Sequence, residues 1–111
     1  MLNELKNDEA MALIGLIKWI ALGDGMITSD EKIVIDHIVD DLGEENYHAL
    51  FDAVDKKFNS IDEFKNFLIN VGTPESRKII YETMIELAEA DAIDIQEADN
   101  ITWLADAWNI E

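Results

Sequence analysis

The sequence predicts an all-α fold, a single bundle of about six helices built from two similar helix–loop–helix halves. Apolar residues recur at helical spacing along most of the chain, and no stretch alternates with period two for long enough to form a strand. An acidic loop near residue 24 also returns, in degenerate form, near residue 91. At 111 residues the chain can build one core but not two, so we expect a single domain over residues 1–111.

Composition limits the classes of function. With 25 Asp and Glu against 8 Lys and Arg, the formal charge is −17. Such a surface repels phosphate backbones and anionic membranes, and it attracts divalent cations or a basic partner. Cysteine is absent, which removes disulfides and thiolate chemistry and fits a cytoplasmic protein. We expect no signal peptide, because no charged and then apolar leader opens the sequence. We expect no membrane segment, because the longest apolar run, 10–22, is too short to span a bilayer.

The first predicted helix begins at a cap on Asn7 or Asp8 and runs to about Leu22. Its apolar residues cover most of the circumference. A helix of that kind must be surrounded by others, so we expect it at the centre of the bundle. Gly23 and Gly25 end it, because glycine accepts positive φ at low cost.

Capping signals place the next two helices. Thr28 with Glu31 forms a capping box, which opens a second helix that runs to about Leu42. A third helix is expected from Glu44 to Phe58, with apolar residues at helical spacing on one side.

Two further capping signals mark the starts of the fourth and fifth predicted helices. Ser60 with Glu63 forms a second capping box and opens a short fourth helix. Thr73 as N-cap and Pro74 at the first helical position start a fifth helix that runs to about residue 90, since proline there loses no hydrogen bond.

The two acidic loops form an internal repeat. Aligning the copies places Glu31 on Glu97 and, with a one-residue deletion in the second loop, Asp24 on Asp91. Asp94 with Glu97 makes a third capping box, which opens the last helix. Two helix–loop–helix halves are therefore expected to pack face to face and to bury both long helices.

These loops resemble the paired motif of the TerB-like family, which reads Ala-x-Ala-Asp-Gly-x-apolar-x-x-x-Glu. The matching residues are Ala21, Asp24, Gly25, Ile27 and Glu31 in the first copy and Ala88, Ala90, Asp91 and Glu97 in the second. Gly23 stands where the motif has its second alanine, and Ala92 stands where it has glycine. The resemblance covers residues 11–110. It implies a TerB-like helical fold, divalent-metal binding, and a role in stress resistance of the tellurite type or in protein interaction.

Five carboxylates are the candidate metal ligands, namely Asp24, Glu31, Asp91, Asp94 and Glu97. A hard cation such as Ca²⁺ or Mg²⁺ takes several oxygen ligands, which two converging loops would supply. A purely structural role is the alternative, because the two glutamates fit capping boxes, Asp94 fits an N-cap and Asp24 fits a turn.

The remaining chemistry-bearing residues fit no catalytic motif. His37 and His48 belong to no metal or catalytic spacing, and Trp19, Trp103 and Trp108 are expected to anchor the core or its boundary. We therefore expect a non-enzymatic protein that binds divalent cations through its acidic loops. The alternatives are a module that docks a basic protein partner and, ranked lower, an acidic mimic of nucleic acid.

Overall fold

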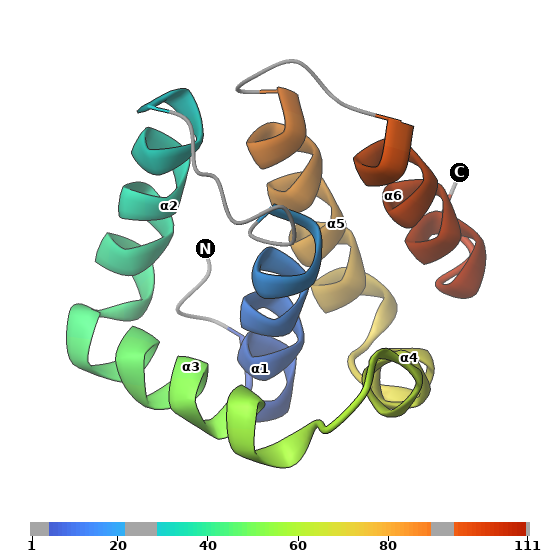
Figure 1. Ribbon diagram of the computed structural model, residues 1–111, viewed down its shortest axis with the longest axis horizontal. Coiled ribbons are helices and arrows are strands. Elements are labelled where there is room, and N and C mark those ends of the chain that lie inside the picture. Colours follow the sequence, from blue (N-terminus) through green and yellow to red (C-terminus); the bar gives the residue numbers. More distant parts are fainter. Residues whose placement is uncertain (1–4, 22–28, 90–94, 111) are drawn as a thin grey trace.

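The computed structural model describes residues 5–21, 29–89 and 95–110, and in these ranges it is a bundle of six α-helices without a strand (Figure 1). The helices are α1 (Asn7–Leu16), α2 (Ser29–Leu42), α3 (Glu44–Lys57), α4 (Ile61–Asn70), α5 (Pro74–Glu89) and α6 (Ile95–Ala107), and a π-helical turn, η2 (Ile17–Ala21), continues α1. The predicted all-α bundle is confirmed.

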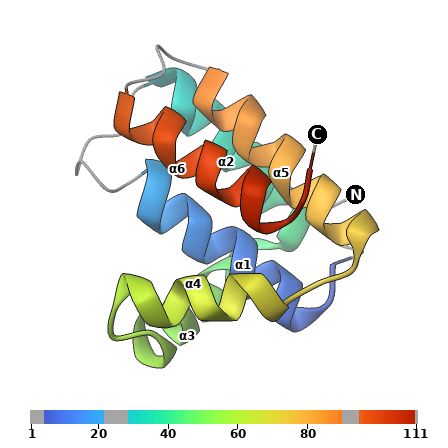
Figure 2. The ribbon, with the colours of Figure 1, turned by 90° about the vertical axis from the view of Figure 1, so that its right-hand side faces the viewer.

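The first helix lies at the centre of the bundle, as predicted. Every residue from Glu9 to Leu16 is buried, and α1 contacts α3, α4 and α5. Figure 2 shows α1 running between α5 and α6 on one side and α3 and α4 on the other. The buried apolar side chains of these elements form one continuous cluster, so all six helices share a core.

The start of α1 differs from the prediction. Its N-cap is Lys6, in an extended conformation, and neither Asn7 nor Asp8 caps the helix. The side chain of Glu9 accepts the backbone N–H of Lys6 at 2.8 Å, which is one half of a capping box. The prediction missed this cap because it considered only residues whose own side chains cap well.

The end of the first helix also differs, because the α-helix does not continue to residue 22. From Ile17 to Ala21 the helix widens into the π-helical turn η2. In this turn Lys18 pairs with Asp55 of α3, and the ring of Trp19 contacts that of Trp103 on α6. Single π-helical turns of this kind occur often at functional sites.

The boundaries of α2, α3 and α4 agree with the prediction to within a few residues. Gly43 separates α2 from α3 with φ of 88°, a conformation that favours glycine. Ser60 caps α4, since its Oγ accepts the backbone N–H of Glu63 at 3.2 Å. The Glu63 carboxylate in turn accepts the N–H of Asn59 at 3.0 Å. The capping box at Thr28 lies outside the described residues.

The start of α5 also follows the prediction. Thr73 caps it, with Oγ1 accepting the N–H of Ser76 at 3.2 Å, and Pro74 is its first residue. Arg77 then ties α5 to the end of α4, because its guanidinium donates to the carbonyls of Ile69 and Val71 at 3.0 and 2.9 Å. No helix among the described segments has the length and apolar character that a bilayer span requires.

Candidate functional site

The side chains of the five predicted metal ligands lie outside the described part of the structure. Asp24, Asp91 and Asp94 fall outside the described residues. Glu31 and Glu97 belong to the first turns of α2 and α6, but their side chains are likewise outside the description. The metal site therefore stays a prediction. Among the side chains that are described, no three His, Asp or Glu residues are grouped as a metal ion would require.

Three of the helix ends that flank the two loops lie at one end of the bundle. In both ribbon views the start of α2, the end of α5 and the start of α6 are at the same end of the bundle (Figures 1 and 2). The described ends are Ser29, Glu89 and Ile95. The position of the two loops themselves lies outside the described residues, so their expected convergence stays a prediction.

An acidic cleft of about 300 Å³ lies between α2 and α5. Val34 and Ile38 form its apolar wall, and Asp40, Asp41 and Glu86 contribute carboxylates. Among its described lining residues there is no lysine or arginine. A cleft with this lining attracts cationic groups, such as the ammonium or guanidinium of a partner.

His37 also lines the acidic cleft, and its side chain is exposed. The second histidine, His48, is exposed on α3, where its imidazole lies 3.9 Å from the carboxylate of Glu44. The two histidines therefore sit on different helices, as their sequence spacing suggested.

A second hollow, the aromatic groove, lies between η2, α3 and α4 and has a volume of about 330 Å³. Trp19, Phe58 and Phe64 form its walls, and Ile61 lies at its edge with 42% of its surface exposed. Gly15 allows Phe64 to pack directly against α1, because a Cβ on this glycine would lie 2.3 Å from Cε1 of the ring. The close packing of Phe64 against α1 thus fixes this wall of the groove.

Lys18 and Asp55 line the same groove as an ion pair. The Lys18 ammonium also lies 4.1 Å from the centroid of the Phe51 ring, within the range of a cation–π interaction. Burial lowers the pKa of Lys18, and the nearby charge of Asp52 offsets part of that effect. The pair spans from η2 to α3 and holds the two elements together across the groove.

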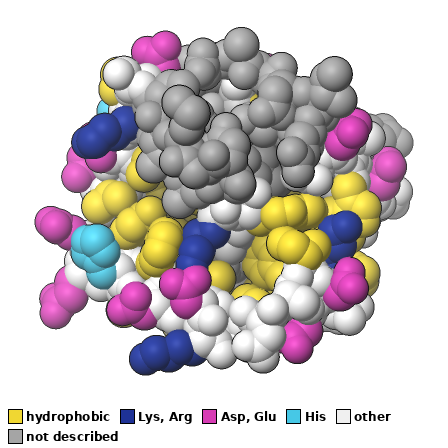
Figure 3. Space-filling model, in the orientation of Figure 1, with side chains coloured by type: hydrophobic (Ala, Val, Ile, Leu, Met, Phe, Trp, Pro, Cys, Tyr) yellow, Lys and Arg dark blue, Asp and Glu magenta, His cyan; other side chains and the backbone are white. Residues whose placement is uncertain are grey.

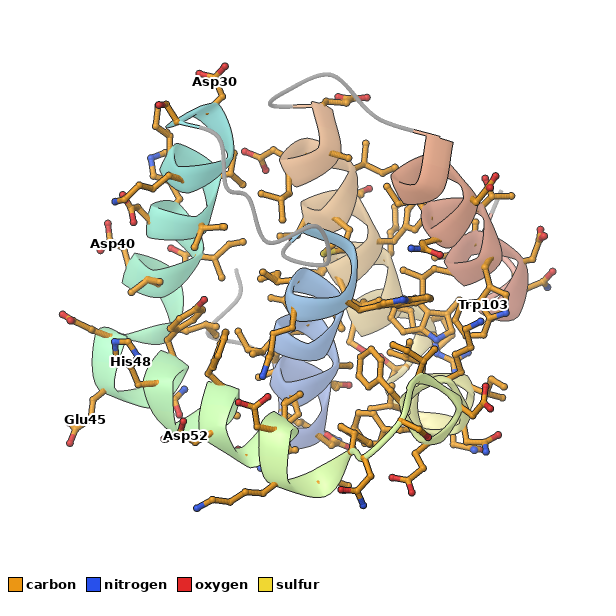
Figure 4. All side chains as sticks on the ribbon, viewed as in Figure 1. Asp30, Asp40, Glu45, His48, Asp52 and Trp103 are labelled. Carbon is orange, nitrogen blue, oxygen red and sulfur yellow. The ribbon has the colours of Figure 1, made fainter. Side chains whose placement is uncertain are left out.

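Trp19, which lines the groove, also belongs to a cluster of aromatic side chains. Its ring meets those of Phe64 and Trp103 edge to face, with centroids 6.4 and 5.9 Å apart. The Lys65 ammonium lies 5.4 Å from the Trp19 centroid and 4.9 Å from that of Trp103. Figure 4 shows Trp103 between α6 and α4. Trp19 and Trp103 are half-buried, and Trp108 is buried, so the expected anchoring role of the three tryptophans is confirmed.

The sequence interpretation missed the aromatic groove. Its lining comes from four elements, α1, η2, α3 and α4, and from residues up to 49 positions apart, from Gly15 to Phe64. One local signal was present, because Lys18 interrupts an otherwise apolar run. A lysine inside a central helix needs a partner for its charge. The partner of Lys18 is Asp55, which lines the groove.

Charge and apolar surface are distributed differently over the molecule. In Figure 3, acidic side chains are scattered around the edge of the face, whereas hydrophobic side chains gather nearer its middle. Comparisons with models of protein families, with curated proteins and with solved structures find no match for this chain. The resemblance to the TerB-like family therefore stays an expectation from the sequence.

Proposed function

We propose that this protein is a non-enzymatic interaction module that docks a basic protein partner through its acidic surface. The observation that carries the proposal is the charge of the described helices. Helix α2 alone has five acidic residues and a single lysine, and that lysine, Lys32, is already paired with Asp36 at 3.2 Å. The net surface available to a partner is therefore strongly negative.

The geometry of the acidic side chains favours docking over a single small ligand. Figure 4 shows Asp30, Asp40 and Glu45 pointing away from the bundle at separate positions along α2 and α3. Carboxylates that diverge cannot surround one ion, but they can meet separate positive charges on a broad partner surface. The acidic cleft adds a place where a basic side chain can enter.

Electrostatic docking of this kind has a known signature. An exposed ion pair contributes about 0.2–1 kcal/mol and is screened by salt. The same field accelerates encounter with partners of opposite charge. Affinity for the basic partner should therefore fall as ionic strength rises, and mainly through the association rate.

The test uses a lysine-rich synthetic peptide and the whole chain. We expect its dissociation constant to rise by about tenfold or more between low and physiological salt. The double variant Asp24→Asn with Asp91→Asn should bind the peptide nearly as well as the wild type, since docking uses the surface and not the loops. Binding that does not change with salt would rule out this function.

A divalent-cation site in the acidic loops is the second candidate. It is favoured by the position of Ser29, Glu89 and Ile95, the described ends of the flanking helices, at one end of the bundle (Figure 1). Asp24 and Asp91 would then be the principal ligands. A stress-resistance role in the cytoplasm belongs to this candidate through the resemblance to the TerB-like family alone.

Calorimetric titration with Ca²⁺, Mg²⁺, Mn²⁺ and Zn²⁺ tests the second candidate. A true site raises the free energy of unfolding by RT ln(1 + [L]/Kd), which is about 2.7 kcal/mol at a hundredfold excess over Kd. Asp24→Asn with Asp91→Asn should abolish both the heat and the rise in Tm. If millimolar ion produces neither in the wild type, the protein is not a cation-binding module.

A further inference from the structure

Charge distinguishes the acidic cleft from two other hollows of the described surface. The aromatic groove has Lys18 in its lining, and a hollow between α5 and residues 108–110 has Arg77 and Lys78. The described lining of the acidic cleft has the carboxylates of Asp40, Asp41 and Glu86 and no basic side chain. A positive group is therefore attracted to the acidic cleft more strongly than to either of the other two hollows.

The carboxylates of the acidic cleft are accessible to a partner. Asp41 on α2 and Glu86 on α5 are exposed, and no ion pair between described residues includes either of them. Lys32, the lysine of α2, pairs with Asp36 instead. Because α2 and α5 each contribute a carboxylate, a positive group that enters between them meets acid from both helices.

The shape of the acidic cleft fits one side chain. Its volume of about 300 Å³ is at the lower end of the range of roughly 300–1,000 Å³ in which proteins hold ligand groups. Val34 and Ile38 form an apolar wall, along which the aliphatic stem of a lysine or arginine can lie. Thr83 donates its hydroxyl to the carbonyl of Ile79 at 2.8 Å, so its oxygen can still accept a hydrogen bond from the charged head.

We propose that the acidic cleft holds one basic side chain of the partner, and that protonation of His37 weakens this contact. The inference rests on the proposed function, a module that docks a basic partner, and it identifies the contact and its regulation. Val34, His37 and Asp41 share one face of α2, since residues three and four apart are neighbours on a helix. An imidazole in this position is neutral in alkaline solution and positive in acid.

A protonated His37 opposes the incoming cation in two ways. It adds a positive charge to a lining whose other described charges are the carboxylates of Asp40 and Asp41 on α2 and Glu86 on α5. It can also pair with Asp41, four residues further along α2, and so occupy a carboxylate that the partner uses. Helix α3 also packs against α2 but contributes no described residue to the lining. Docking should therefore weaken as the pH falls from about 8 to about 5.

The composition of the chain makes this pH range simple to interpret. There are two histidines and no cysteine, and aspartates and glutamates ordinarily titrate near about pH 4. The second histidine, His48, is exposed on α3 and outside the described lining of the acidic cleft (Figure 4). His48 is therefore a matched control for His37.

The first experiment locates the contact by NMR, with arginine blocked at both ends and with citrulline blocked in the same way as its uncharged analogue. In low salt the methyl signals of Val34 and Ile38, which line the acidic cleft, should shift with arginine and not with citrulline. The methyl signals of Val54, in the aromatic groove, should shift with neither.

Two variants that each remove one exposed carboxylate test the same contact. Glu86→Gln changes the acidic cleft, whereas Glu45→Gln makes the same change on α3, outside the lining. Both should fold, which circular dichroism checks. The dissociation constant of the lysine-rich peptide should rise about threefold more in Glu86→Gln than in Glu45→Gln. Equal effects, or signals of Val34 and Ile38 that do not move, would show that the acidic cleft is not the contact.

The second experiment follows the dissociation constant of the same peptide, acetylated and amidated, from about pH 8 to about pH 5. The lysines of the peptide stay charged throughout. In the wild type and in His48→Gln the constant should rise about threefold towards acid, and in His37→Gln it should change little. A wild type without this response, or a response that persists in His37→Gln, overturns the role of His37. If the peptide does not bind the wild type at any pH in low salt, the docking function itself fails.

Discussion

Glu9, a residue with only 5% of its surface exposed, accepts the backbone N–H of Lys6 at 2.8 Å and also reaches the first turn of α5. There it also meets the hydroxyl of Ser76 and the backbone of Thr73. Burial alone would raise the pKa of Glu9, but the hydrogen bonds and the charge of Lys6 outweigh it and hold the pKa below its usual value. The charged carboxylate therefore joins the beginnings of α1 and α5.

This relationship makes part of the stability depend on pH. Because the folded-state pKa of Glu9 is lowered, its contribution is present above the unfolded pKa and is lost as pH falls through the folded pKa. We expect Glu9→Gln to lower the free energy of unfolding by about 1 kcal/mol near pH 7. The difference from the wild type should shrink towards zero in acid, as measured by urea unfolding across the pH range.

Glu75→Gln is the matched control, because Glu75 lies exposed in the first turn of α5. Its effect near neutral pH should be only a few tenths of a kcal/mol, through the weakened interaction with the helix N-terminus. A gap between Glu9→Gln and the wild type that is the same in acid as at neutral pH would contradict the role assigned to the Glu9 charge.

The Glu9 contact also shows which features the sequence could predict. The caps at Ser60 and Thr73 join residues three apart, so a local pattern is sufficient to find them. Glu9 and Ser76 are 67 positions apart, and only the packing of α1 on α5 brings them together. Glu9 was therefore missed even though its neighbours in the sequence were assigned to a helix.

The same reasoning applies to the candidate sites. Burial of the first helix followed from its apolar circumference, which is a property of one segment. The aromatic groove combines Lys18 and Trp19 of the π-helical turn with residues of α3 and α4 that follow more than 30 positions later in the chain. Such a combination of distant segments is not encoded in a short window. The acidic loops were found because the chain repeats them, and their metal role stays a prediction.

Gly15→Ala should destabilise the fold even though alanine is the better helix former. The added Cβ would lie 2.3 Å from Cε1 and 2.4 Å from Cζ of Phe64, and that buried ring is held by Phe58 and Trp19. We expect a net loss of about 1–3 kcal/mol, larger than the helix-propensity gain of about 1 kcal/mol. Chemical denaturation measures it.

A double-mutant cycle with Phe64→Leu attributes that loss to the clash. Alone, Phe64→Leu should cost about 1–2 kcal/mol by leaving space in the core. In the Gly15→Ala background it should cost much less, because the smaller side chain makes room for the methyl group. Costs that simply add would show that the ring and the glycine are not coupled.

Trp108→Phe should loosen the end of α6. The indole Nε1–H donates to the carbonyl of Leu68 at 2.6 Å, and Trp108 is only 4% exposed. Phenylalanine fills most of the volume but leaves that carbonyl without its donor, which should cost about 1–3 kcal/mol. Faster amide hydrogen exchange in α6 and at the end of α4, with α2 unchanged, would be the accompanying sign.

Two aspartates at opposite ends of α2 should respond oppositely to neutralisation. Asp30 lies in the first turn, where a negative charge is stabilised by the helix dipole, and Asp41 lies in the last turn, which has no basic residue. Both are exposed. We expect Asp41→Asn to raise Tm by about 2 °C and Asp30→Asn to lower it by a similar amount in low salt.

Salt separates this effect from a change in packing. Added NaCl should raise the Tm of the wild type, because it screens the repulsion within a chain of charge −17. It should also bring the two variants closer to the wild type. If Asp41→Asn lowers Tm, the charge of Asp41 does not destabilise this end of α2. If the Tm of the wild type does not rise with salt, repulsion among the acidic residues is not a significant cost in this fold.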